Sequence, residues 1–164
     1  MMFYQNILFT QDECDVMRNV NRDFKSISKE DNGSVSYKSF RNTHDAIVRD
    51  SLTLNLILKK LKPIGLCSLP MVHYQITYGG RFAPHTDVTS DPRFKTIVVL
   101  LSPSTEYSGG VLSIEGSSVN TNQGNVIVFD VRKLHEVSEL VSGERHTLVM
   151  WTNKDNFNIP KTIL

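Results

Sequence analysis

The stretch YGGRFAPHTD, residues 78–87, ends a run of β-forming residues with the triplet His85-Thr86-Asp87. Side chains two residues apart on an extended strand point to the same face, so this triplet brings an imidazole and a carboxylate together. A third ligand from a distant segment, for which His135 is the candidate, would complete a set of two imidazoles and one carboxylate. This set is the facial triad of non-haem iron(II) oxygenases, and it leaves coordination positions open for other reactants. The stretch therefore predicts an iron site built on β-strands.

Each part of this constellation has a simpler interpretation when it is taken alone. An isolated His-x-Asp triplet is also typical of a surface turn, and His135 also suits an ordinary histidine at the end of a strand. The ordered set of His85 and Asp87, a long interval, His135 and then Arg145 is more specific than its parts. The planar guanidinium of Arg145 can bind one carboxylate of a dicarboxylate cosubstrate through two parallel hydrogen bonds. Taken alone, the same arginine would be an ordinary surface residue of a turn.

Short β-type runs fill the sequence around this stretch, separated by clusters of Gly, Pro, Ser and Asn. They are Met71–Tyr78, Phe94–Leu101, Val111–Glu115, Asn125–Asp130 and Thr147–Thr152, with an additional outer strand suggested at Ser34–Phe40. Several short strands with turns between them favour a sandwich or barrel over a sheet with helical crossovers. The paired glycines Gly79-Gly80 and Gly109-Gly110 fit tight turns and close backbone approach at strand ends.

Helical patterns precede the strands. Thr10 and Glu13 form a capping-box pattern ahead of one helix, and a second helix starting at Asp45 or Ser51 extends to about Leu61. Pro63 and Gly65 end that second helix. We therefore expect a single domain over residues 1–164, mainly β, with helical support in about residues 1–66 and a jelly-roll core in about residues 70–153.

Composition narrows the range of partners. The formal net charge of the 164 residues is +1, and no basic block is present, so we do not expect a nucleic-acid partner. Cys14 and Cys67 lie far apart without a Cys-x-x-Cys pattern, which favours a reduced, cytoplasmic setting. The N-terminal residues lack a signal-peptide pattern, and the apolar runs are too short to cross a bilayer. The sequence carries no signal for the oligomeric state.

Three blocks in order resemble the prolyl 4-hydroxylase-like family of 2-oxoglutarate/iron(II)-dependent dioxygenases. The run 78–87 resembles the metal strand of that family, and the segment 107–112 is similar to its YxGGxL turn. His135-Glu136-Val137, then Gly143-Glu144-Arg145 and Trp151, resembles the HxV…GxR…W block that closes the site. With the helical N-terminal part, the resemblance covers most of the chain.

The resemblance implies a double-stranded β-helix, a cupin-like jelly roll, with iron near one open end. It implies that His85, Asp87 and His135 are the iron ligands and that Arg145 binds the distal carboxylate of 2-oxoglutarate. Family members also place a strand tyrosine near this cosubstrate. Tyr78 is the preferred candidate for that role, and Tyr74 is the alternative. Trp151 and Phe82 are expected to be walls of the core or of the pocket.

The expected activity is that of an iron(II)- and 2-oxoglutarate-dependent dioxygenase, which consumes dioxygen and releases succinate and CO2, with ascorbate as a reductant. A prolyl residue in a peptide or protein is the first candidate substrate. A free amino acid or another small molecule is the alternative substrate. A hypothesis of a different functional class is that the chain is a non-catalytic cupin-like binding module. A zinc hydrolase is less attractive, because no candidate general base stands beside the ligands and Arg145 would have no role. Iron dependence together with 2-oxoglutarate consumption would separate these alternatives.

Overall fold

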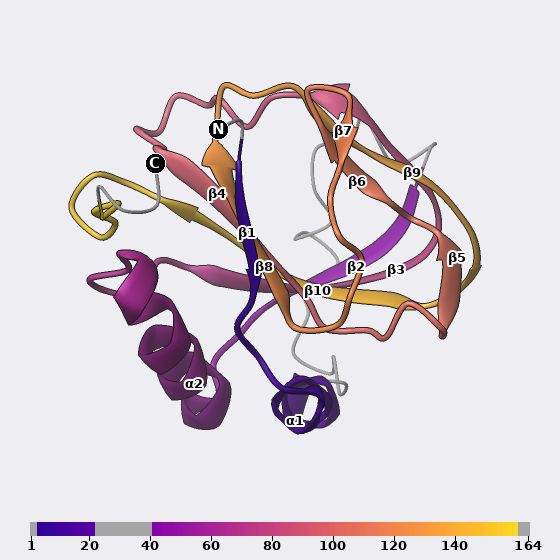
Figure 1. Cartoon of the computed structure of the whole chain (residues 1–164), viewed down its shortest axis with the longest axis horizontal. Helices are drawn as coiled ribbons and strands as arrows, with labels where there is room; N and C mark the ends of the chain where they lie inside the picture. Colours follow the sequence, from indigo (N-terminus) through magenta and orange to yellow (C-terminus); the bar gives the residue numbers. More distant parts are fainter. Residues whose placement is uncertain (1–2, 22–40, 161–164) are drawn as a thin grey trace.

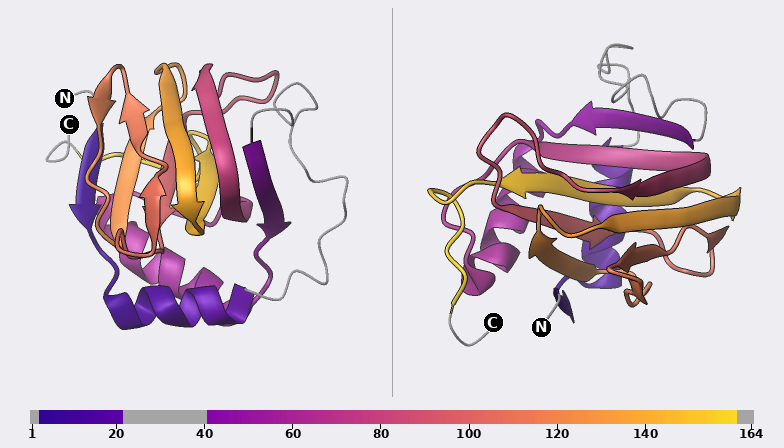
Figure 2. Two further views of the ribbon diagram at one scale, coloured as in Figure 1. Left: turned by 90° about the vertical axis from the view of Figure 1, so that its right-hand side faces the viewer. Right: turned by 90° about the horizontal axis from the view of Figure 1, so that it is seen from above.

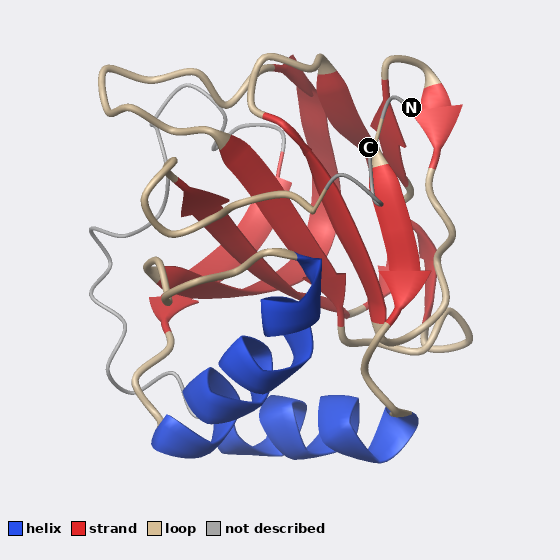
Figure 3. Cartoon of the chain, turned by 60° about the vertical axis from the view of Figure 1, so that its left-hand side comes forward, coloured by secondary structure: helices blue, strands red, loops and turns tan. Residues whose placement is uncertain are grey.

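A curled antiparallel sheet with helices against its outer side forms the body of the molecule (Figure 1). The computed structural model describes residues 3–21 and 41–160. Two α-helices, α1 (Gln11–Asn21) and α2 (Ser51–Leu61), lie together below the sheet when the molecule is turned (Figure 3). Within these residues no helix combines the length and the apolar character that a membrane crossing requires.

All strand pairs of the sheet are antiparallel, as the jelly-roll prediction requires. The order of neighbouring strands is β1-β8-β4-β10-β3-β9-β6-β7, with β2 also paired to β3 and β5 to β9. The bounds are β1 Tyr4–Ile7, β2 Arg41–Ile47, β3 Val72–His85, β4 Lys95–Leu100, β5 Tyr107–Gly109, β6 Leu112–Ile114, β7 Ser117–Ser118, β8 Asn125–Asp130, β9 His135–Gly143 and β10 Arg145–Thr152. The five runs expected in the C-terminal part are confirmed as β3, β4, β6, β8 and β10.

The sheet curls because β3 is long enough to belong to two parts of it (Figure 2). Residues 72–77 pair with β10 in the wider part, while residues 80–85 pair with β9 in the narrower part. The register with β9 shifts between Gly80 and Phe82 and again between Phe82 and His85. Such irregularities bend a strand and increase its twist.

Two apolar clusters occupy the two faces of the wider part, because alternate residues of a strand point to opposite sides. On β10, Leu148 and Met150 join the cluster that packs against Cys14 and Met17 of α1. Val149 instead joins the inner cluster, which fills the space between the two parts of the sheet. Other members of the inner cluster include Val98, Leu100, Leu112, Ile114, Ile127 and Phe129.

The helix ends follow the local sequence signals. The capping box of α1 is confirmed, since the Thr10 amide donates to Glu13 Oε2 at 2.9 Å and the Glu13 amide donates to Thr10 Oγ1 at 3.2 Å. The second helix starts at Ser51, with Asp50 Oδ1 accepting from the Thr53 amide at 2.7 Å. It passes into the short 3₁₀-helix η3 (Lys62–Ile64), which contains Pro63. Gly65, with φ of 120°, then ends the helical segment.

Several strands lie where no strand was predicted. The N-terminal part, expected to supply helices, also contributes β1 and β2 to the sheet. Asp45, one of two possible helix starts, is instead a residue of β2. The strands β5, β7 and β9 are new as well, and the suggested strand Ser34–Phe40 lies outside the described residues.

Candidate metal centre

His85 and His135 are brought together by the pairing of β3 with β9. They face each other in register at the ends of these strands, and their ring centroids are 4.3 Å apart. Asp87 lies just beyond the end of β3, so the expectation that it shares the strand with His85 is corrected. Its backbone amide donates to the carbonyl of Val131 at 2.9 Å, which fixes the chain after the strand. The triplet therefore converges because the chain is tied down beyond the strand, and not through strand alternation alone.

The two imidazoles are oriented in the same way by the backbone. Nδ1 of His85 lies 2.7 Å from the carbonyl of Ala83, and Nδ1 of His135 lies 3.0 Å from the carbonyl of Lys133. A carbonyl oxygen only accepts hydrogen bonds, so each Nδ1 must carry the proton and donate it. In the neutral imidazole, Nε2 then carries the lone pair. Both Nε2 atoms point toward Asp87, at 3.6 Å from Oδ1 for His85 and 3.4 Å from Oδ2 for His135.

Asp87 is buried, and its carboxylate is held by a neighbouring strand. Thr96 of β4 donates from Oγ1 to Asp87 Oδ2 at 2.6 Å. A hydroxyl bonded to an ionised carboxylate makes a short, strong hydrogen bond. Potential ligand atoms of His85, Asp87 and His135 all lie within 4.8 Å of one another. In the part of the chain that the structure describes, this is the one group of three or more side chains that could hold a metal ion.

Burial sets the protonation of His135. Desolvation lowers the pKa of its imidazole below the usual 6.5, and this effect outweighs the attraction of the Asp87 carboxylate. The Phe129 ring, at a centroid distance of 4.8 Å, covers one side of the imidazole. The side chain is therefore neutral at neutral pH, which is the state that binds a metal.

Arg145 starts β10 on the face that carries the inner cluster. It is opposite Thr77 of β3 in register and is only 5% exposed. Burial lowers the pKa of its guanidinium, while the Tyr107 side chain, hydrogen-bonded to it, opposes that shift. Among the described residues, no carboxylate forms an ion pair with Arg145, and its Nε has no hydrogen-bond partner. The guanidinium is thus a buried charge that lacks its counter-ion, which is costly unless a ligand supplies one.

Thr147 is a second residue with an unmet hydrogen bond on this face. It lies two residues after Arg145 on β10, so both side chains point to the inner side. Its Oγ1 is buried and has no partner among the described residues. Thr147 was not among the predicted site residues, although its spacing of two from Arg145 on a β-type run was a usable signal.

The turn with Gly109 and Gly110 makes room for Arg145. The φ angles are 73° for Gly109 and 62° for Gly110, in the left-handed region that favours glycine. A Cβ added to Gly110 would lie 3.0 Å from both Arg145 Cδ and Leu140 Cδ1. A larger residue at position 110 would therefore push on the arginine side chain as well as strain the backbone.

The structure places the three tyrosines of interest in different environments. Tyr74 is fully buried in the core between sheet and helices, where its hydroxyl lies 2.6 Å from His146 Nδ1. Tyr78 is 37% exposed, and its ring meets that of His44 edge-on at 5.0 Å. The tyrosine beside the Arg145 guanidinium is Tyr107 of β5, which was predicted only as part of a turn motif.

Known proteins are similar to this chain in sequence and in fold. A PKHD-type hydroxylase from Prochlorococcus marinus (strain MIT 9312) is 25% identical over 177 residues, covering 92% of this chain and 77% of the relative. The viral collagen prolyl hydroxylase of Paramecium Bursaria Chlorella virus-1 superposes with a TM-score of 0.67 at 17% identity, over 92% of this chain and 94% of that one. A prolyl hydroxylase from Trichoplax adhaerens, solved with a hypoxia inducible factor peptide fragment, gives a TM-score of 0.70 at 15% identity, over 94% and 84% of the two chains.

The solved structures establish a shared fold, the double-stranded β-helix predicted from the sequence. A match to a family model is independent of the solved structures, and it covers the β core with all the candidate ligands. Residues 70–153 fit the family model described as the 2OG-Fe(II) oxygenase superfamily. The chain belongs to this superfamily of enzymes, for which iron(II) and 2-oxoglutarate are the implied cofactor and cosubstrate.

Proposed function

We propose that this chain is an iron(II)- and 2-oxoglutarate-dependent dioxygenase that hydroxylates a prolyl residue in a peptide or protein, with release of succinate and CO2. One observation carries the proposal. Two imidazole Nε2 lone pairs and a buried carboxylate converge at the end of β3, and a buried arginine without a counter-ion faces the same space between the two parts of the sheet. A metal ion and a dicarboxylate would satisfy these two demands together.

The residues present fit an iron(II) ion. Imidazole and carboxylate ligands suit this ion, and three protein ligands leave coordination positions open. His85, Asp87 and His135 would hold the metal. The carbonyls of Ala83 and Lys133 fix the two imidazoles, and the Thr96 hydroxyl fixes the carboxylate. Such outer contacts orient ligands and raise metal affinity.

The inner face of β10 fits the distal carboxylate of 2-oxoglutarate. Arg145 would bind this carboxylate through the fork of its guanidinium, and Thr147 would donate its unpaired hydroxyl. Tyr107 lies beside the guanidinium and would hold it in place. The role of Tyr78 near the cosubstrate stays a prediction, since its ring lies against His44 at the edge of the sheet.

The chain itself supplies binding, orientation and exclusion of water. The iron and 2-oxoglutarate supply the oxidative chemistry that activates dioxygen when they are bound. Leu112, Ile114 and Phe129 line the space between the two parts of the sheet with apolar side chains, which keeps this space dry. Neutral His135 keeps its ligand atom free of a competing proton.

The test is conversion of 2-oxoglutarate to succinate by anaerobically purified protein supplied with iron(II), ascorbate and air. Proline peptides in the same reaction are analysed for hydroxyproline. His135→Ala and Arg145→Gln should abolish succinate formation. Arg132→Gln is the matched control, because the Arg132 side chain is 80% exposed and pairs with Asp130 on the surface.

Each failure of this test has its own meaning. Succinate without hydroxyproline would move the substrate to a free amino acid or another small molecule. Activity with zinc(II) alone, or full activity in Arg145→Gln, would contradict the dioxygenase proposal.

A further inference from the structure

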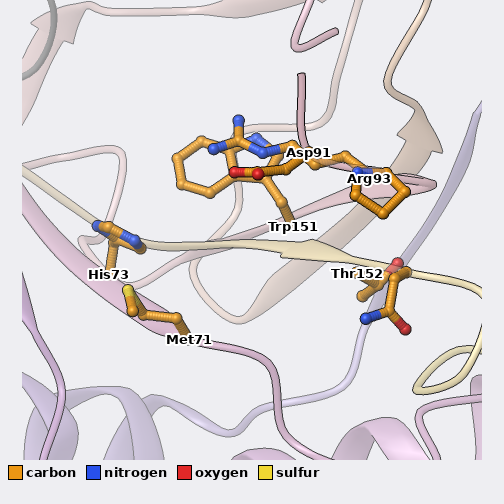
Figure 4. A pocket seen from close by; sticks show the side chains of 8 residues that line it. Met71, His73, Asp91, Arg93, Trp151 and Thr152 are labelled. Atoms are coloured by element: carbon orange, nitrogen blue, oxygen red, sulfur yellow. The ribbon is translucent and has the colours of Figure 1, made fainter. Parts of the chain in front are cut away.

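A hollow of about 250 Å³ lies between the start of β3, the end of β10 and the turn before β4, and it has no role in the proposal above. Its walls include Met71, His73, Asp91, Arg93, Trp151 and Thr152 (Figure 4). The volume is below the range of about 300–1,000 Å³ that is typical of pockets for whole small ligands. It therefore suits one part of a larger substrate, such as a single side chain or a chain end.

Two sets of contacts link Trp151, in the wall of this hollow, to the candidate metal ligands. Trp151 of β10 is paired in register with Thr96 of β4, and the Thr96 hydroxyl donates to Asp87. Trp151 also packs against the inner cluster that contains Phe129, whose ring covers His135. A substrate whose reacting carbon lies at the metal would extend naturally over the hollow.

Arg93 is held in this hollow by an aromatic ring. Its guanidinium carbon lies 4.3 Å from the centroid of the Trp151 ring, and His73 meets the same ring edge-on at 5.1 Å. A stacked guanidinium is oriented by its face, so its N–H groups along the edge are available to bind a carboxylate. Figure 4 shows the guanidinium beside the indole, with the Asp91 carboxylate on the same rim.

The charge of Arg93 is not matched by a neighbour among the described residues. No ion pair joins it to Asp91, although the two residues share a tight turn in which the Arg93 amide donates to the Asp91 carbonyl at 2.8 Å. Asp91 is exposed, so water screens its negative charge. His73 is already engaged by Asp45, with Nδ1 2.9 Å from Oδ1.

We propose that the hollow is a substrate subsite in which Arg93, stacked on Trp151, binds a carboxylate that flanks the reacting residue. This inference rests on the proposed function and narrows its substrate class to peptides that carry a carboxylate next to the target residue. The carboxylate can come from an acidic side chain next to the target residue or from a peptide C-terminus, since both offer the same two oxygens to the guanidinium.

The test uses Trp151 as its own probe, because it is the only tryptophan in the chain. The full chain, loaded with zinc(II) and 2-oxoglutarate so that no turnover occurs, is titrated with two pairs of short proline peptides while tryptophan fluorescence is followed. One pair carries Glu or Gln beside the proline, with both ends blocked. The other pair carries Ala there and has a free or an amidated C-terminus.

The expected result is that the acidic member of at least one pair binds about tenfold more tightly than its neutral counterpart. Arg93→Gln should remove this preference, and Arg93→Lys should keep part of it because the charge remains. Asp91→Asn should increase the preference, because a repelling charge is removed. Lys59→Gln, on the exposed side of α2, is the control and should change nothing.

Equal affinities for acidic and neutral peptides, or a preference that survives Arg93→Gln, would overturn the subsite. So would the absence of any fluorescence response in a protein that still converts 2-oxoglutarate, and the dioxygenase proposal would then stand alone. Peptide binding with the Arg93-dependent preference, but without hydroxyproline in the turnover assay, would leave the subsite standing and reject the prolyl hydroxylase.

Discussion

Thr96→Val tests whether the metal centre depends on the strand behind it. Thr96 is 1% exposed, and its hydroxyl donates to Asp87 Oδ2 at 2.6 Å. Valine keeps the shape and the β-propensity of threonine but removes the donor. The buried carboxylate of Asp87, 9% exposed, would lose a hydrogen bond of a kind that is worth about 1.5–3 kcal/mol. Without it the carboxylate is free to turn away from the two imidazoles.

Two magnitudes follow from this loss. The metal affinity should fall by about 10–100-fold, as is typical when an outer partner of a metal ligand is removed. The unfolding free energy of the metal-free protein should fall by about 1–3 kcal/mol, because a buried acceptor is left unpaired. Anaerobic titration calorimetry with iron(II) measures the first quantity, and urea denaturation in the presence of a chelator measures the second.

Thr53→Val is the matched control for this prediction. Thr53 is also fully buried, and its Oγ1 accepts from Asn21 Nδ2 at 3.0 Å, but it lies in α2 on the outer side of the sheet. This variant should lose stability and keep the metal affinity of the wild type. If Thr96→Val binds iron(II) within about twofold of the wild type, the hydroxyl does not position Asp87 and the reasoning is refuted.

Three further predictions address other parts of the chain. Tyr107→Phe should weaken 2-oxoglutarate binding about tenfold in calorimetry, because the lost hydroxyl holds Arg145. The affinity for 2-oxopentanoate, which lacks the distal carboxylate, should stay unchanged. Equal weakening of both ligands would contradict this role of Tyr107. Burial raises the pKa of the Cys14 thiol to about 12, which makes it unreactive in the native protein. Iodoacetamide should therefore label exposed Cys67 in the native protein and Cys14 only after denaturation. Equal labelling rates of the two cysteines in mass spectrometry would contradict the burial of Cys14. The pKa of His135 is lowered in the folded state, so as the pH falls this histidine is protonated in the unfolded chain before it is protonated in the folded protein. The unfolding free energy of the metal-free protein should therefore fall as the pH drops through 6.5. His135→Gln should flatten this part of the pH profile of stability.

Local patterns in the sequence were sufficient for much of the fold and of the candidate site. The capping box at Thr10 and Glu13 and the stop at Gly65 depend on residues a few positions apart, and the structure contains both. The β-type runs that became β4, β8 and β10 are nearly all buried, which is why their apolar character was visible. The three candidate ligands were predicted from their residue types and order alone; the structure brings them within 4.8 Å of one another, and their role as ligands stays a prediction.

What the sequence did not predict depends on pairing between distant strands. Much of β9 is exposed, so the residues around Val137 and Leu140 are largely polar. Neither an alternating pattern nor a continuous apolar run therefore marked this segment as a strand. Thr96 and Asp87 meet through the packing of β4 beside the loop that follows β3, a contact that no short-range pattern encodes. Thr147 likewise becomes informative only when Arg145 is known to be buried on the same face.

The choice between Tyr74 and Tyr78 shows why period-two counting has a limited range. Counting in steps of two assigns Tyr74 and Tyr78 to the same face of β3. The face of the candidate site is the one on which Thr77 pairs with Arg145, and Tyr74 lies on the opposite, helix side. Beyond Thr77, two register shifts against β9 separate the count from His85. Tyr107 reaches Arg145 from a different strand, across a turn whose Gly110 leaves space for the arginine Cδ. The YxGGxL turn therefore acts on Arg145 in two ways. Its tyrosine, Tyr107, contacts the guanidinium, and its second glycine, Gly110, makes room for the rest of the arginine side chain.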